Sequence, residues 1–312
     1  MNYIQLAFKG KNELWIFLLT TILVSGLFIA NLIFFIFFGD QIDFVEEQRK
    51  MMELIPSKNF WLAANLLPFA FLLGLLFLLV VFLHKRSLLS LTTTRKKIDF
   101  KRIFFAFSLI AIITLFSFGL SYYLDPSNIE LQFNPLKFTI LLMVSLLLFP
   151  FQVGLEEYLF RGYLMQQIGI MVRNKWVPLL ITSVMFGIFH SANPEVGELG
   201  SIIMIFYIGT GLLLGIITLM DEGLELAMGF HFGNNFLAAT LVTADWTALQ
   251  TDAIFIYTGD SGGTTILEII LPVFIIYPII LLILAKKYKW TNWKDKLFGK
   301  VEPPAEEAPV IE

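Results

Sequence analysis

Repeated apolar runs of about 20 residues constrain this chain more than any other feature of its sequence. A helix of that length crosses the hydrocarbon core of a bilayer, which is roughly 30 Å thick. Hydrophobic residues fill 57% of the 312 positions and charged residues only 15%, against roughly 25% charged residues in soluble domains. A soluble fold of this size could not cover so much apolar surface, so lipid has to cover it.

The apolar runs predict an all-α fold: a polytopic membrane bundle of about eight transmembrane helices with an internal polar cavity. The predicted spans are 14–38, 60–84, 103–124, 138–156, 176–191, 200–219, 226–243 and 264–285. The first run is too long for the core of a signal peptide and lacks a small-residue cleavage site, so we expect it to be retained. The sequence contains no cysteine, which excludes disulfides and thiolate ligands.

The distribution of Lys and Arg predicts the orientation of the bundle. If the N-terminus is cytoplasmic, the inner segments hold 18 of the 22 Lys and Arg residues and the outer loops hold four. This asymmetry follows the positive-inside rule. We therefore expect a cytoplasmic N-terminus at 1–13, a bundle over 14–300 and a disordered, acidic and equally cytoplasmic tail at 301–312. The composition favours a bacterial plasma membrane.

Ionisable residues at the end of one apolar run are the first candidates for function, because such residues are rare in membrane segments and usually face the bundle interior. The stretch FQVGLEEYLFRGYLM, at 151–165, contains Glu156, Glu157 and Arg161. Glu157 and Arg161 are i,i+4 neighbours on one helical face, where we expect an ion pair. Glu156 lies about 100° around the helix and can face another partner.

A polar hinge at 173–176 relates the glutamates to His190. Glu156 lies 16 residues before residue 172, and His190 lies 14 residues after residue 176. At 1.5 Å per residue these arms measure about 24 Å and 21 Å. A helical hairpin would therefore bring Glu156 and His190 to nearly the same depth, where they can meet. Because the first arm carries Arg161, Gln166 and Gln167, we expect part of it to project into the cytoplasm or to lie at the membrane interface.

Three motifs in these segments resemble those of the CPBP family, the Abi-type intramembrane proteases that include CAAX prenyl endopeptidases and bacteriocin-processing enzymes. They are EExxxR from Glu156 to Arg161, FxxxH from Phe186 to His190 and HxxxN from His231 to Asn235, in the order of the family. The resemblance covers about 138–243. It implies an endopeptidase that cleaves a membrane-associated peptide or protein, with Glu156, His190, His231 and Asn235 as catalytic residues and Glu157, Arg161 and Phe186 in support.

The resemblance leaves two mechanisms open. In one, Glu156, His190 and His231 bind one divalent metal, with zinc as the first candidate, and a metal-bound water is the nucleophile. In the other, Glu156 and His190 activate water without a metal, and His231 and Asn235 donate hydrogen bonds to the oxyanion. Asn is an unusual zinc ligand but an ordinary hydrogen-bond donor, which favours the second mechanism.

Two functions of another class also remain open. A proton-coupled transporter could use Glu156 and the histidines as a relay, and a non-catalytic immunity or scaffold protein could keep the cavity and act by binding. The expected partners are membrane lipid and a peptide or lipidated protein substrate, with no nucleic acid. The sequence identifies neither the substrate nor the oligomeric state.

Two remaining features carry less weight. The string GDSGG, at 259–263, copies the surroundings of a serine-protease nucleophile, but no histidine lies nearby in sequence. We expect a Gly-rich turn there rather than a nucleophilic Ser261. Glu268 lies about one turn into the last predicted span, so we expect its carboxylate at the membrane interface.

Overall fold

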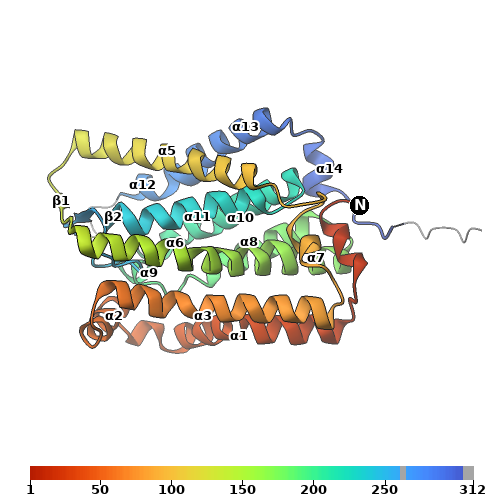
Figure 1. Ribbon diagram of the computed structural model, residues 1–312, viewed down its shortest axis with the longest axis horizontal. Helices are drawn as coiled ribbons and strands as arrows, with labels where there is room; N and C mark the ends of the chain where they lie inside the picture. Colours follow the sequence, from red (N-terminus) through yellow and green to blue (C-terminus); the bar gives the residue numbers. More distant parts are fainter. Residues whose placement is uncertain (261–264, 305–312) are drawn as a thin grey trace, which may run out of the picture.

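The computed structural model describes residues 1–260 and 265–304 (Figure 1). Its α-helices are α1 (Leu14–Phe38), α2 (Phe44–Glu53), α3 (Lys58–Leu78), α4 (Leu88–Thr92), α5 (Phe100–Leu124), α6 (Pro135–Glu157), α7 (Met165–Val172), α8 (Trp176–Ile188), α9 (Pro194–Leu199), α10 (Met204–Asp221), α11 (Glu225–Thr240), α12 (Ile266–Leu271), α13 (Tyr277–Tyr288) and α14 (Trp293–Phe298). Its strands are β1 (Ile129–Leu131), β2 (Val242–Thr243) and β3 (Phe255–Tyr257).

Six helical segments in the described ranges are long and apolar enough to cross a membrane. They are Leu14–Phe38, Lys58–Leu83, Phe100–Leu124, Pro135–Val172, Ser201–Asp221 and Ile266–Tyr288. α8 and α11 have only 13 and 16 residues, or about 20 and 24 Å, and are too short to cross alone. The chain is therefore an all-α polytopic membrane protein, as predicted, but the count of eight spans is not confirmed.

The helices run roughly parallel in three layers (Figure 1). α1 and α3 form one outer layer, α5 with α12 and α13 forms the other, and α6, α8, α10 and α11 lie between them. The helix pairs with the most extensive contacts are α5 with α11, α8 with α10 and α3 with α6. Only 11% of the most apolar window of α1 is buried, against 44% in the span that contains α10. The outer layers therefore expose the most apolar surface to lipid, and the central layer is the more buried of the three.

Glycines allow the central helices to approach one another closely, as is common in membrane bundles. A Cβ atom on Gly229 of α11 would lie 2.1 Å from the carbonyl oxygen of Ile103 in α5. A Cβ atom on Gly211 of α10 would lie 2.7 Å from the carbonyl oxygen of Ser183 in α8. The first contact fixes α11, the helix that carries the predicted HxxxN motif, against α5, and the second fixes α10 against α8.

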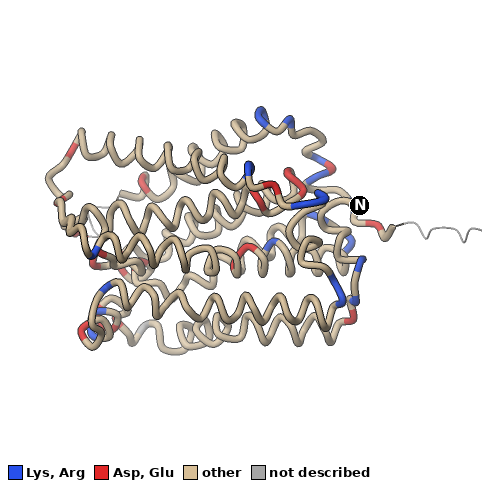
Figure 2. The backbone as a smooth tube through the Cα atoms, viewed as in Figure 1, with Lys and Arg blue, Asp and Glu red and all other residues tan. Residues whose placement is uncertain are grey.

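Lys and Arg gather at the end of the bundle where the N-terminus, α13 and α14 lie (Figure 2). The segment Ile4–Lys9 packs at this end against α7, and Tyr3 and Ile4 are each 1% exposed. At the other end of the chain, Val301 is buried and donates a hydrogen bond to the Arg173 carbonyl. Both predicted terminal segments are therefore at least partly packed. Residues 305–312 and Ser261 lie outside the described residues.

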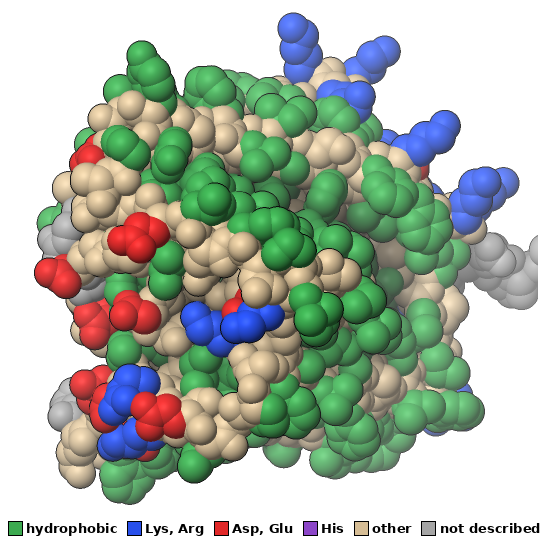
Figure 3. All heavy atoms as spheres, turned by 60° about the vertical axis from the view of Figure 1, so that its left-hand side comes forward, with side chains coloured by type: hydrophobic (Ala, Val, Ile, Leu, Met, Phe, Trp, Pro, Cys, Tyr) green, Lys and Arg blue, Asp and Glu red, His purple; other side chains and the backbone are tan. Residues whose placement is uncertain are grey.

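A small sheet closes the opposite end of the bundle. β3 pairs antiparallel with β1, with Ile129 opposite Tyr257, and parallel with β2, with Val242 opposite Phe255. Strands of two or three residues carry almost no periodicity, which is why the sequence did not predict them. The segment between α1 and α3 lies at this end and forms α2. Figure 3 shows hydrophobic side chains over the flank of the bundle and acidic side chains toward this end.

Candidate active site

Glu156 and Glu157 lie where α6 changes its helical pitch. Asn134 caps the N-terminus of α6, because its side chain accepts a hydrogen bond from the Lys137 amide at 3.1 Å. Pro135 is the first residue of the helix. Directly after Glu157 the chain continues as a π-helical segment over 158–164 before α7 begins. Such segments inside α-helices frequently occur at functional sites.

The arm that follows Glu157 is buried within the protein, and its predicted position at the cytoplasmic side or the interface stays a prediction. Arg161, Gln166 and Gln167 are at most 1% exposed. Gln166 bonds to Arg86 and to the backbone of Ser90, and Gln167 bonds to Asn12. Each of these two glutamines therefore has a protein partner, as buried polar groups require.

Glu157 and Arg161 form the predicted ion pair. Their Oε1 and NH1 atoms lie 2.8 Å apart, and both side chains are fully buried. Arg161 also donates a hydrogen bond from NH2 to the Gly211 carbonyl at 3.1 Å, and its guanidinium lies 4.5 Å from the centre of the Phe186 ring. The pair thus joins α6 to α10 and α8.

His231, in the second turn of α11, contacts both glutamates. Its Nδ1 lies 2.8 Å from Glu157 Oε1, and its Nε2 lies 3.4 Å from Glu156 Oε2. Glu157 is paired with Arg161 and only accepts hydrogen bonds, so Nδ1 of His231 carries a hydrogen. Nε2 and Glu156 Oε2 lie within ion-pair distance but form no hydrogen bond, so Glu156 Oε2 stays open to a further partner.

Gln152, which the sequence analysis did not identify, connects Glu156 to Asn235. Its Nε2 donates to Glu156 Oε1 at 2.6 Å, and its Oε1 accepts from Asn235 Nδ2 at 3.0 Å. Glu156 Oε2 has no hydrogen-bond partner among the described residues. The available signal was a lone glutamine four residues before Glu156 on an apolar helix, a spacing that places both side chains on one face.

His190 lies beyond the end of α8, and its ring faces other partners. Nδ1 donates to the Phe186 carbonyl at 2.7 Å, and the ring stacks on Tyr207 with centroids 4.5 Å apart. No hydrogen bond or ion pair joins His190 to Glu156 in residues 1–260 or 265–304. The Phe186 ring links the two histidines instead, at 4.7 Å from the ring of His190 and 5.8 Å from that of His231.

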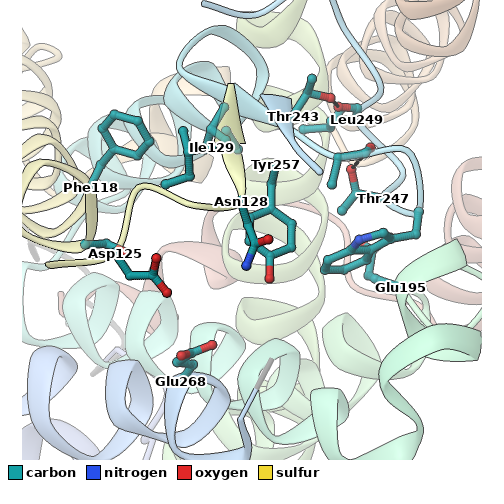
Figure 4. A pocket seen from close by; sticks show the side chains of 15 residues that line it. Phe118, Asp125, Asn128, Ile129, Glu195, Thr243, Thr247, Leu249, Tyr257 and Glu268 are labelled. Atoms are coloured by element: carbon teal, nitrogen blue, oxygen red, sulfur yellow. Dashed lines mark hydrogen bonds between the residues drawn. The ribbon is translucent and has the colours of Figure 1, made fainter. Parts of the chain in front are cut away.

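A cavity of about 660 Å³ lies near the sheet at the acidic end of the bundle (Figure 4). Its lining includes Asp125, Glu195, Tyr257 and the exposed Glu268, and none of the predicted site residues. Glu195 accepts a hydrogen bond from the Tyr207 hydroxyl, and Tyr207 stacks on His190. The cavity wall is therefore connected to His190 through one tyrosine. The sequence predicted a polar cavity inside the bundle. The cavity near the sheet is a different one, because the polar side chains around Glu156 are packed against each other.

The side chains around Glu156 do not match the predicted three-ligand metal site. Glu156 Oε2 and His231 Nε2, at 3.4 Å, are spaced like two ligands of tetrahedral zinc, which sit about 3.3 Å apart. Among the described residues, however, no three His, Asp or Glu side chains converge on one point as metal ligands. The Nδ1 of His190 is held by Phe186, and its ring packs between two aromatic rings. Metal binding stays a prediction.

Comparison with known proteins assigns this region to a family. Residues 135–237 match the family model described as "Type II CAAX prenyl endopeptidase Rce1-like". This segment is therefore similar to an Rce1-like domain and is called the Rce1-like domain below. The chain is also 26% identical over 251 residues to the uncharacterized protein YyaK of Bacillus subtilis (strain 168), a match that covers 78% of this chain and 83% of the relative. No solved structure matches the chain.

The Rce1-like domain contains all three predicted motifs, from Glu156 to Asn235. The predicted family resemblance is therefore confirmed, and the domain supports membership of the intramembrane CAAX-type proteases. The domain begins with α6 and ends within α11. α1, α3 and α5 flank it in the outer layers (Figure 1).

Proposed function

We propose that this chain is an intramembrane endopeptidase that hydrolyses a peptide bond in a membrane-associated peptide or protein. One observation carries the proposal: Glu156, His231 and Asn235 belong to a single connected polar group inside the Rce1-like domain, with Glu156 and His231 buried. An ionisable group of this kind in a bundle interior is costly and marks a functional site. A carboxylate, an imidazole and an amide together supply the acid–base and hydrogen-bonding groups that hydrolysis requires.

Glu156 acts as the general base. Its Oε1 is held by Gln152, whereas Oε2 has no hydrogen-bond partner in the described residues. Oε2 takes a proton from water while the water oxygen attacks the carbonyl carbon of the substrate. When the C–N bond breaks, the same proton passes from Glu156 to the leaving nitrogen, so that Glu156 is ionised again.

His231 and Asn235 stabilise the oxyanion. His231 Nε2 is a hydrogen-bond donor in the imidazolium form, which is the form that would hold the oxyanion. Asn235 has two amide hydrogens, and Gln152 accepts only one of them. Glu157 and Arg161 support this state, because the carboxylate fixes the His231 ring and Arg161 neutralises the carboxylate.

His190 is the second group proposed to act on water. The Phe186 carbonyl accepts the hydrogen on Nδ1, so Nε2 is the ring nitrogen that can accept a proton. Tyr207 and Phe186 fix the plane of the ring from either side. We derive no step through a metal, because the predicted ligands do not converge.

The description of the matching family favours a prenylated CAAX protein as the substrate class. The relative in Bacillus subtilis is consistent with the proposed bacterial plasma membrane, with both termini on the Lys- and Arg-rich cytoplasmic side. Nothing in the comparisons favours a transporter or a non-catalytic immunity or scaffold protein.

A pair of peptides tests the proposed activity. Purified protein in liposomes receives a farnesylated peptide that ends in a CAAX sequence, and the same peptide without the farnesyl group. Release of the C-terminal tripeptide from the farnesylated form only would support the CAAX-type activity. Cleavage of both peptides would support an endopeptidase with a wider substrate class. If neither peptide is cut, a comparison of membrane proteomes from cells that carry wild type or Glu156→Gln decides whether any protein is processed.

A further inference from the structure

Gln152 contacts two proposed catalytic residues at once, although it belongs to none of the three motifs. It lies one helical turn before Glu156 on α6, and its side chain is buried, with 7% of the residue exposed. Its partner Asn235 comes from α11, 83 residues further along the chain. A polar side chain that joins two such residues across helices fixes their relative positions.

The chemistry of the partners fixes the direction of these hydrogen bonds. An ionised Glu156 only accepts, so Gln152 must turn its Nε2 toward the carboxylate, and the donor–acceptor distance is 2.6 Å. Its Oε1 then faces Asn235, which must donate through Nδ2 at 3.0 Å. Asn234 in turn donates to Asn235 Oδ1 at 3.2 Å. The chain of amides therefore presents the NH₂ group of Asn235, rather than its oxygen, on the side of Glu156.

We propose that Gln152 is a positioning residue for the hydrolytic reaction. It holds the Glu156 carboxylate with Oε2 directed away from the amide, and it orients the Asn235 amide as a donor to the oxyanion. This inference rests on the proposed function. A side chain at position 152 needs one hydrogen-bond donor and one acceptor at the same distance from the backbone. Gln has both, whereas Met has a similar length but neither group.

Two substitutions separate positioning from packing. Gln152→Met keeps the length of the side chain and removes both hydrogen bonds. We expect kcat to fall about 10- to 100-fold with KM within twofold, a smaller loss than the roughly 10²- to 10³-fold that removal of an oxyanion donor costs. When Asn235 is already replaced by Ala, Gln152→Met should lower kcat by a much smaller factor. Residue 152 then has only one proposed catalytic partner, Glu156.

Gln152→Glu gives a readout in the pH profile. A protonated carboxyl has an O–H donor and a C=O acceptor and can replace both bonds of the amide, whereas an ionised carboxylate repels Glu156. We expect Gln152→Glu to approach the wild-type kcat at low pH and to lose activity as pH rises, so that the optimum moves to lower pH. A residue that served packing alone would leave the shape of the profile unchanged.

Gln167→Met is the matched control. Gln167 is also a buried glutamine, on the continuation of the same helix, and it bonds to Asn12 away from the site. We expect its kcat and pH profile to match the wild type, at a similar cost in thermal stability.

The measurement is a set of steady-state and pH-rate profiles on the farnesylated CAAX peptide for wild type and all the variants named above, with Glu156→Gln as the inactive reference, together with infrared difference spectra. The carboxylate band that disappears in Glu156→Gln should shift in Gln152→Met and stay in place in Gln167→Met, which tests the hydrogen bond without any substrate. If Gln152→Met does not fold, the pH profile of Gln152→Glu decides. An unshifted band, or a wild-type kcat in Gln152→Met while Glu156→Gln is inactive, overturns this inference alone. Full activity in Glu156→Gln overturns the proposed function instead.

Discussion

Glu157 and His231 lie 74 residues apart in the sequence and are joined by a 2.8 Å contact between Oε1 and Nδ1. The same Oε1 atom is 2.8 Å from Arg161 NH1. The second glutamate of the motif is therefore a support for the imidazole, and its charge is neutralised inside the bundle. Glu156 is left to face His231 Nε2 and Gln152.

Arg161→Ala should destabilise the protein as well as inactivate it, because it leaves the Glu157 carboxylate buried without a counter-charge. Breaking a buried pair in this way costs about 3–5 kcal/mol. Thermal unfolding in detergent, followed by Trp fluorescence, measures the loss. Arg161→Lys keeps the charge and should be intermediate. An unchanged melting temperature in Arg161→Ala would show that the pair does not hold the site together.

Gly229→Ala should loosen the contact between α5 and α11. The added Cβ would lie 2.1 Å from the Ile103 carbonyl oxygen, so the helices have to move apart, at a cost of about 1–3 kcal/mol. The matched control is Gly119→Ala on α5, where a Cβ meets nothing within 4 Å and the melting temperature should stay the same. Equal effects of the two substitutions would contradict the helix packing described here.

His84 should make the stability of the Lys- and Arg-rich end depend on pH. Burial lowers the pKa of His84, and the nearby Arg86 lowers it further, against the opposing effects of the Lys11 carbonyl and Glu13. The folded state thus binds fewer protons than the unfolded state, and stability is lost as pH falls below about 6.5. The loss is at most about 1.4 kcal/mol per pH unit for one group. Between pH 7.5 and 5, wild type should lose more thermal stability than His84→Gln, and parallel curves would refute the assignment.

Chelation should leave activity intact. The predicted ligands Glu156, His190 and His231 do not converge as a three-ligand group in the described residues. We therefore expect peptide cleavage to continue after EDTA and 1,10-phenanthroline treatment, and elemental analysis to find less than one zinc per chain. Loss of cleavage that added zinc restores would establish the metal mechanism in place of the one proposed here.

Local spacing predicted part of this site well. The i,i+4 relationship was sufficient for the ion pair of Glu157 with Arg161, since helical geometry alone places the two side chains together. His231 and Asn235 are likewise four residues apart on α11, a spacing that places both side chains on one face of the helix. The hydropathy of the spans was sufficient for the fold class, because lipid demands long apolar helices.

Contacts between helices were not predictable from spacing. The bond from Asn235 to Gln152 and the stack of His190 on Tyr207 depend on how α6, α8, α10 and α11 pack, and the single sequence does not encode that packing in any periodicity. The hairpin estimate placed Glu156 and His190 at one depth, but it could not give the rotation of the His190 ring beyond the end of α8. Two of the eight predicted spans, now α8 and α11, are helices too short to cross alone.

Glu156→Gln offers the most direct test of the central claim, that the Glu156 carboxylate activates water inside the bundle. Wild type and the variant are incubated with the farnesylated CAAX peptide in H₂¹⁸O, and the products are weighed by mass spectrometry. The account predicts one ¹⁸O atom in the newly formed carboxyl group with wild type, and cleavage reduced at least about 10³-fold in a folded Glu156→Gln protein. Cleavage by Glu156→Gln at the wild-type rate would contradict it.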